Sequence, residues 1–292
     1  MKKIIVSLLL ALMSMSAHAS KTIIVNWPFG VGDRGGQYIQ HILTRANEQQ
    51  KIYNFVLVSV HGGGGTIAAT STLSSKKPTL LAHSMSYFIR PHVYPDTAGY
   101  TFDQFETTLP VVTSPFAVIS NKGFDPSRGG SIAVVGIGTS THLLALQIQK
   151  KYPKVVIVAY KSLTDAAKDF RGGHVDMTID FVQEINKYLD IQVLGTTGTK
   201  YIKNYPRLMD QYPDSTALLS ISFFILNPVG MPEAPEIRKI LYNANINNNS
   251  LQQLFNEDHA QAYDMLVQDY NSWYKQSITR IKALTQNIHK QQ

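Results

Sequence analysis

Short apolar, β-branched runs alternate along most of the chain with stretches whose apolar residues recur at helical spacing. This alternation predicts βαβ units, and therefore largely parallel sheets flanked by helices. Helices are predicted at Gln37–Glu48, His142–Lys151 and Thr164–Arg171. The strands are predicted at Thr22–Asn26, Phe55–Ser59, Thr79–Ala82, Phe116–Ser120, Ile132–Val135, Val155–Val158, Met177–Asp180, Val193–Thr196 and Phe223–Leu226.

After Pro235 the pattern becomes wholly helical, with a break predicted in the Asn-rich stretch Asn243–Ser250. A stripe of apolar residues near helical spacing is expected to pack on a core: Leu266, Tyr270, Trp273, Ile281, Leu284 and Ile288. The stretch Asn121–Gly130 contains Gly, Pro, Asp and Ser, and is the predicted linker. A chain of 292 residues suits one large or two medium domains.

The first residues follow the pattern of a cleavable secretory signal. Lys2 and Lys3 precede the apolar run Ile4–Met13, and an A-x-A site ends at Ala19. The apolar run is too short to cross a hydrocarbon core of about 30 Å, and no later run approaches the roughly 18 apolar residues that a spanning helix needs. The sequence therefore predicts cleavage after Ala19 and a mature protein in the periplasm.

Composition removes several classes of site. The chain has no cysteine, which excludes disulfides, thiolate metal sites and cysteine nucleophiles. It contains neither a G-x-S-x-G elbow nor an H-E-x-x-H motif, and its nine histidines lack metal-ligand spacing. The excess of 27 Lys+Arg over 20 Asp+Glu favours anionic partners at long range, but no basic block is dense enough for nucleic acid. We therefore expect no metal, no cofactor and no nucleic-acid partner.

Three glycine-rich loops each join a predicted strand to a predicted helix. They span 27–36, 62–66 and 136–142. The first contains a G-x-G-x-x-G at Gly30, Gly32 and Gly35, but the next strand ends without the acid that a dinucleotide site requires. Such loops present free backbone N–H groups and a positive helix end to a carboxylate or phosphate. A tight turn or simple helix capping is the alternative interpretation for each loop.

In their order and spacing, several motifs resemble those of the extracytoplasmic solute receptors of tripartite tricarboxylate transporters, the Bug family. Pro28-Phe29 with its glycines resembles the family's P-F-x-x-G-G loop, and Gly63–Ala69 resembles its G-A-G-G-T-I-A-A segment. Further similar stretches are Tyr100–Phe105, Gly136–Leu143, Tyr160-Lys161 through Gly172–Met177, and Asn227–Pro232. The resemblance runs from about Ile23 to the C-terminal helices.

The resemblance implies an α/β, two-lobed periplasmic binding protein of type II-like architecture, each lobe a mainly parallel sheet flanked by helices. Lobe one would comprise residues 20–120 and 225–292, including the C-terminal helices, and lobe two residues 121–224. The hinge would be crossed near Ser120 and Phe224. The implied function is capture of a small organic anion, by a monomer, for delivery to the permease subunits in the membrane. Docking of the closed form on a signalling receptor, or an enzyme on the same scaffold, are the alternatives.

The implied ligand-binding residues lie mainly in the glycine-rich loops: Pro28, Phe29, Gly30, Gly32, Asp33, Arg34, Gly64, Gly65, Ser84, Gly138, Thr139, Ser140, His142, Tyr160 and Asp180. Backbone N–H groups after Phe29 and in the loop from Gly136 would hold the ligand carboxylate. The chain departs from the family's pattern at Asp33, which replaces a glycine. Asp33 is expected either to pair with a basic group such as Arg34 or to select a ligand with a cationic part.

Overall fold

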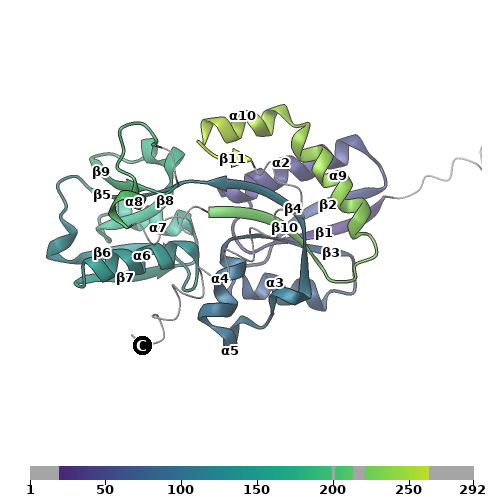
Figure 1. The fold of residues 1–292 in the computed structure, drawn as a ribbon, viewed down its shortest axis with the longest axis horizontal. Helices are drawn as coiled ribbons and strands as arrows, with labels where there is room; N and C mark the ends of the chain where they lie inside the picture. Colours follow the sequence, from purple (N-terminus) through teal and green to yellow (C-terminus); the bar gives the residue numbers. More distant parts are fainter. Residues whose placement is uncertain (1–19, 199–200, 213–220, 263–292) are drawn as a thin grey trace, which may run out of the picture.

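The computed structural model describes residues 20–198, 201–212 and 221–262. They form two sheets with flanking helices, which lie side by side and are joined by β4 and β10 (Figure 1). The predicted signal segment and the C-terminal apolar stripe from Leu266 to Ile288 fall outside the described residues. Among the residues described, no helix combines the length and apolar character needed to cross a membrane.

The first sheet has six strands in the order β11-β4-β10-β3-β1-β2. Their bounds are β1 Lys21–Trp27, β2 Tyr53–Ser59, β3 Thr79–Ser84, β4 Phe105–Ser114, β10 Ile221–Pro228 and β11 Gln261–Ala262. β1 runs parallel to β2 and β3, whereas β10 runs antiparallel to β3 and β4. We call this sheet and its helices lobe one.

The second sheet has five strands in the order β7-β6-β8-β5-β9, and with its helices it forms lobe two. The strands are β5 Phe116–Asn121, β6 Gly130–Val135, β7 Val155–Tyr160, β8 Met177–Phe181 and β9 Ile191–Thr196. β6 is parallel to β7 and β8, and β5 is antiparallel to β8 and β9.

The expectation of two lobes, each a sheet flanked by helices, is confirmed, but both sheets are mixed and not mainly parallel. Parallel pairs occur where a helix makes the return connection, as between β1 and β2 or β6 and β7. The strands that carry the chain between lobes need no such crossover helix. They enter antiparallel to their neighbours.

The chain passes between the lobes at Pro115 and again between Thr196 and Ile221. β5 therefore belongs wholly to lobe two and β10 wholly to lobe one. The boundaries expected at 120/121 and 224/225 fall inside these two strands and need to be moved by a few residues. The stretch Asn121–Gly130 connects β5 to β6 within lobe two, so it is not a linker between the lobes.

Helices cover the faces of both sheets. In lobe one they are α2 Arg34–Gln49, α3 Thr66–Ser74, α4 Ser86–Val93, α5 Pro95–Ala98, α9 Ala234–Ile246 and α10 Asn249–Glu257, and in lobe two α6 Ser140–Lys151, α7 Leu163–Arg171 and α8 Leu208–Gln211. The short 3-10 helices are η1 Gly63–Gly65, η2 Phe102–Gln104, η3 Pro126–Arg128 and η4 Val182–Lys187. α9 packs against α2, which places these late helices on lobe one. The predicted break falls between α9 and α10, but β11 follows α10, so the described end is not wholly helical.

Aromatic side chains from the two sheets meet where the lobes face each other. Phe181 of β8 stacks on Phe223 of β10 with ring centroids 6.3 Å apart, and Phe116 of β5 lies 5.0 Å from Phe181. Trp27, at the end of β1, contacts Phe223 at 5.9 Å. The crossing strands thus bring rings from both lobes into one cluster, and a cavity adjoins it.

Candidate ligand-binding cleft

A narrow cavity of about 40 Å³ lies between the lobes, and we call it the inner cavity. Most of its wall is apolar, and the polar remainder consists largely of hydroxyl groups. The lining residues are Trp27, Phe29, Asp33, Ser84, Ser86, Phe116, Val135, Ser140, Thr141, Ser162, Leu163, Phe181, Ile221 and Phe223. Ends of strands from both sheets supply much of this wall, in accord with the rule that open α/β folds bind ligands at the carboxyl edges of their strands.

The start of α6 forms the polar part of the wall on lobe two. Thr139 caps the helix by accepting a bond from the backbone of His142, and its hydroxyl donates to the Val135 carbonyl at 2.7 Å. The Ser140 hydroxyl is buried and has no hydrogen-bond partner among the described residues. The first turn of a helix also carries free N–H groups and a partial positive charge. This end of the cavity can therefore receive an anionic group.

Asp33 occupies the matching helix start on lobe one. It caps α2, accepting a bond from Gly36 N at 2.8 Å. Burial raises the pKa of Asp33 to about 7, although hydrogen bonds from the Gly36 backbone and the Trp27 side chain lower it. Because the protein's own carboxylate already caps α2, this helix start is less suited to a ligand carboxylate than that of α6.

A second, more polar cavity of about 270 Å³ adjoins the first, and we call it the outer cavity. The two share Asp33, Leu163 and Phe181. The outer cavity is further lined by Gly32, Arg34, Gln37, Thr164, Ala167, Arg171, Asp180, Glu184, Lys187 and Tyr188. Most of the charged groups of the cleft therefore lie outside the apolar inner cavity.

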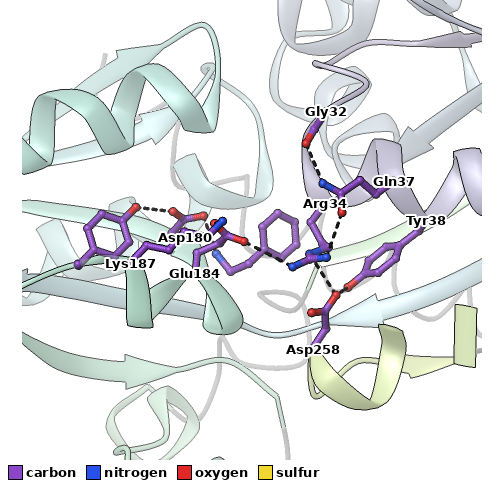
Figure 2. Close-up of polar contacts among 10 residues, drawn as sticks. Gly32, Arg34, Gln37, Tyr38, Asp180, Glu184, Lys187 and Asp258 are labelled. Atoms are coloured by element: carbon purple, nitrogen blue, oxygen red, sulfur yellow. Dashed lines mark hydrogen bonds and ion pairs between the residues drawn. The ribbon is translucent and has the colours of Figure 1, made fainter. Parts of the chain in front are cut away.

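Arg34 connects the lobes across the outer cavity (Figure 2). Its Nε lies 3.2 Å from Asp258 Oδ2 in lobe one, and its Nη2 lies 3.7 Å from Glu184 Oε1 in lobe two. Tyr38 also donates a hydrogen bond to Asp258, and burial raises the pKa of that carboxyl group. Asp33 makes no ion pair with Arg34 in the described structure, so of the two alternatives for Asp33 the pairing with Arg34 is not observed.

The ion pair between Arg34 and Glu184 is expected to favour the closed arrangement. A partly exposed pair contributes about 0.2 to 1 kcal/mol, so Glu184→Gln should shift the balance between closed and open forms toward open by up to about fivefold. The chain has no cysteine, so spin labels on cysteines introduced at the exposed positions Gln40 and Lys168 can report the interlobe distance. The variant should show a larger long-distance population.

The matched control for that measurement is Glu48→Gln. Glu48 pairs with Arg45 at 3.3 Å within α2 and does not touch lobe two. It should leave the distance distribution unchanged. A Glu184→Gln distribution identical to that of the control would show that the interlobe pair does not bias closure.

A second interlobe contact joins two of the glycine-rich loops. Arg90 of α4 donates from Nη1 to the Ile137 carbonyl at 2.9 Å and from Nε to Thr66 Oγ1 at 3.0 Å. Gly64 faces the same carbonyl, since a Cβ placed on it would lie 3.3 Å from that oxygen. The loops at 62–66 and 136–142 therefore meet across the cleft.

The predicted site residues divide between these places. Phe29, Asp33, Ser84 and Ser140 line the inner cavity, and Gly32, Asp33, Arg34 and Asp180 line the outer one. The others line neither of the two cavities: Pro28, Gly30, Gly64, Gly65, Gly138, Thr139, His142 and Tyr160. Direct ligand contact by these residues stays a prediction.

Several residues outside the cavities have structural contacts that explain their positions. Gly30 O accepts from the Trp27 indole at 3.1 Å, and Gly138 N donates to His142 Nδ1 at 3.2 Å. Tyr160 donates to Asp169 at 2.9 Å. Asp180 lines the outer cavity but also accepts from Phe181 N at 2.8 Å, and burial raises its pKa to about 6.

The residues of the inner cavity that sequence reasoning missed are mostly apolar. Trp27, Phe116, Phe181 and Phe223 lie in or beside predicted strands, where an aromatic residue is typical of any core. Their shared position at or near strand ends is the signal that could have identified them. Leu163 follows a strand-to-helix connection that contains no glycine, so the glycine pattern gives no indication of it.

Solved structures share this architecture. The periplasmic binding protein BugD superposes with a TM-score of 0.79 at 18% identity, covering 91% of this chain and 97% of that one. MatC from Rhodopseudomonas palustris, solved with bound malate, gives 0.77 at 15% identity, covering 91% and 99%. An R. palustris protein solved with adipate gives 0.77 at 18% identity, covering 91% and 96%.

Sequence comparison adds no closer relative, since no protein-family model and no curated protein sequence matches the chain. At identities below one fifth, the structural likeness shows the fold alone. It nevertheless extends over nine tenths of this chain and nearly all of each compared structure. The chain therefore has the two-lobed fold of periplasmic solute-binding proteins.

Proposed function

We propose that this protein is a periplasmic solute-binding receptor that captures a small organic anion between its two lobes and has no catalytic step. The observation that carries the proposal is the start of α6, where a buried hydroxyl without a partner, Ser140, lines an interlobe cavity beside free helix N–H groups. The compared structures solved with malate and adipate support the choice of a carboxylate.

The geometry provides a simple binding mechanism. The anionic group would accept bonds from Ser140 and the first turn of α6, each worth about 1.5 to 3 kcal/mol for a charged acceptor. The apolar body would lie against rings such as Trp27 and Phe29 of lobe one. A ligand that touches both lobes stabilises the closed form by its higher affinity for that form than for the open one.

Delivery to a membrane permease of the tripartite tricarboxylate type belongs to the same proposal. The closed, ligand-bound monomer would be the form that the permease recognises. The motif resemblance and the shared fold support this partner.

Calorimetric titration with mono-, di- and tricarboxylates tests the proposal. At least one carboxylate should bind, and Ser140→Ala should weaken that binding about 10- to 150-fold, as expected for loss of one hydrogen bond to a charged group worth about 1.5 to 3 kcal/mol. The matched control is Ser250→Ala, the same change near the start of α10, where Ser250 is exposed and remote from the cleft. Turnover of a titrant, or equal affinity in both variants, would contradict the proposal.

A further inference from the structure

We propose that Asp33 selects ligands that carry an ammonium group beside their carboxylate, so that the preferred solute is a small amino acid with an apolar side chain. This inference rests on the proposed function and assigns its substrate class. Its grounds are the charges, the rings and the two-lobe placement of the groups that line the inner cavity.

The first ground is the charge of the groups that line the inner cavity. Asp33 is the one ionisable side chain among the described residues that line the inner cavity. A di- or tricarboxylate bound wholly there would bring further negative charge beside Asp33 with no lysine or arginine in the wall to offset it. A buried charge of this kind is costly unless it is paired. A ligand with one carboxylate and one ammonium group meets this requirement.

The basic groups nearby do not meet that need. Arg34 follows Asp33 directly in sequence, but its guanidinium lies against Asp258 and Glu184, as Figure 2 shows. Arg171 and Lys187 line the outer cavity, not the inner one. No ion pair of Asp33 occurs in the described part of the chain. Apart from the N–H groups at the start of α2, which it caps, its charge is therefore left to a proton or to a cation from outside.

Aromatic rings line the inner cavity together with Asp33. Trp27 lines the cavity together with Asp33, and its ring lies 5.3 Å from that of Phe29 in an edge-on arrangement. Both rings line the same cavity as Asp33. Aromatic faces attract ammonium groups, most strongly where water is excluded. A carboxylate beside such rings is a combination suited to an ammonium group.

The two charged ends of an amino acid would then contact different lobes. Its ammonium group would face Asp33 on lobe one, and its carboxylate the start of α6 on lobe two, where Ser140 has no partner. In this structure both groups line the inner cavity, and the body of the ligand would extend from it into the adjoining outer cavity. The separation of charge in the ligand would therefore be what couples binding to closure.

Matched probes test the inference by calorimetry at pH 8. The first set is valine, 3-methylbutanoate without the ammonium group, and 2-methylpropylamine without the carboxylate. The second is phenylalanine, 3-phenylpropanoate and 2-phenylethylamine. In at least one set the amino acid should bind about 10-fold or more tightly than either truncated probe, as expected for one charged hydrogen-bonded contact.

Asp33→Asn should remove that preference, weakening the amino acid about 10-fold and leaving the simple carboxylate unchanged or tighter. Asparagine also caps helices well, so circular dichroism should confirm a folded variant. The matched control is Asp125→Asn, which changes an exposed cap of η3 and should keep the wild-type preference.

The outcomes separate this inference from the proposed function. Two results would overturn the role of Asp33 and leave the anion receptor intact. In the first, simple carboxylates bind as well as the amino acids or better. In the second, succinate binds and neither amino acid does. Failure of every carboxylate, amino acids included, would overturn both. An amino-acid preference that survives Asp33→Asn would overturn the role of Asp33 alone.

Discussion

Replacing Gly65 by alanine should lower the free energy of unfolding by roughly 2 to 5 kcal/mol, the sum of an overpacking cost and a left-handed backbone cost. Gly65 has a φ of +103°, and a Cβ there would lie 1.9 Å from Nε2 of His83. His83 is fully buried and in contact with Phe29 and Tyr87, so its ring has little room to move. Urea unfolding followed by circular dichroism measures the loss.

Two variants define what that loss means. Gly30→Ala is the control, since nothing lies within 4 Å of a Cβ at Gly30 and its φ is outside the left-handed region. It should cost under about 1 kcal/mol, in the range of ordinary surface substitutions. In a His83→Ala background the cost of Gly65→Ala should shrink to the backbone part. Equal losses at Gly65 and Gly30 would refute the packing argument.

Between pH 4 and pH 8 the free energy of unfolding of Asp33→Asn should rise by about 2 to 4 kcal/mol relative to that of the wild type. An aspartate titrates near 3.8 in the unfolded chain, whereas burial raises the pKa of Asp33 to about 7 in the folded protein. Between these values the folded state holds a proton that the unfolded state has lost. Stability from this group therefore falls as pH rises, and asparagine lacks that dependence.

The comparison between variants is needed because other buried groups act in the opposite direction. Burial lowers the pKa of His83 to about 3 and that of His142 to about 4. Stability from these histidines is present above pH 6.5 and is lost as pH falls toward their folded pKa values. Urea unfolding of both proteins at several pH values isolates Asp33. A difference that does not change with pH would contradict the assignment, and Asp125→Asn, at an exposed carboxyl whose pKa hydrogen bonds lower, should not reproduce it.

Local patterns located most strands, but not their surroundings. All nine predicted strands overlap observed ones, because β-branched runs indicate extended, buried backbone whatever lies beside them. β4 was missed since Glu106, two threonines and Pro110 interrupt its apolar pattern. The pairing of β4 with β10 shifts register between Phe223 and Phe224, and Phe224 lies opposite Pro110. The directions of the strands and the lobe boundaries depend on where the chain passes from one lobe to the other. No local sequence pattern indicates those positions.

The candidate cleft shows the same division. Glycine-rich loops before helices carried a physical signal, and they led to Asp33 and Ser140. The partners of those loops come from distant segments. Asp258, which forms an ion pair with Arg34, is more than 200 residues away in sequence. The residues next to Asp258 in the sequence do not indicate that contact. Aromatic lining residues become recognisable only when both sheets are placed together.

The contact of Arg90 with lobe two has an evolutionary consequence. Arg90 bonds to a main-chain oxygen at Ile137, and any residue at that position supplies the same oxygen. The side chains of the 136–142 loop can therefore mutate without removing this interlobe bond. This closing contact and the choice of solute therefore depend on different atoms, and a descendant chain could acquire a new solute while keeping the contact.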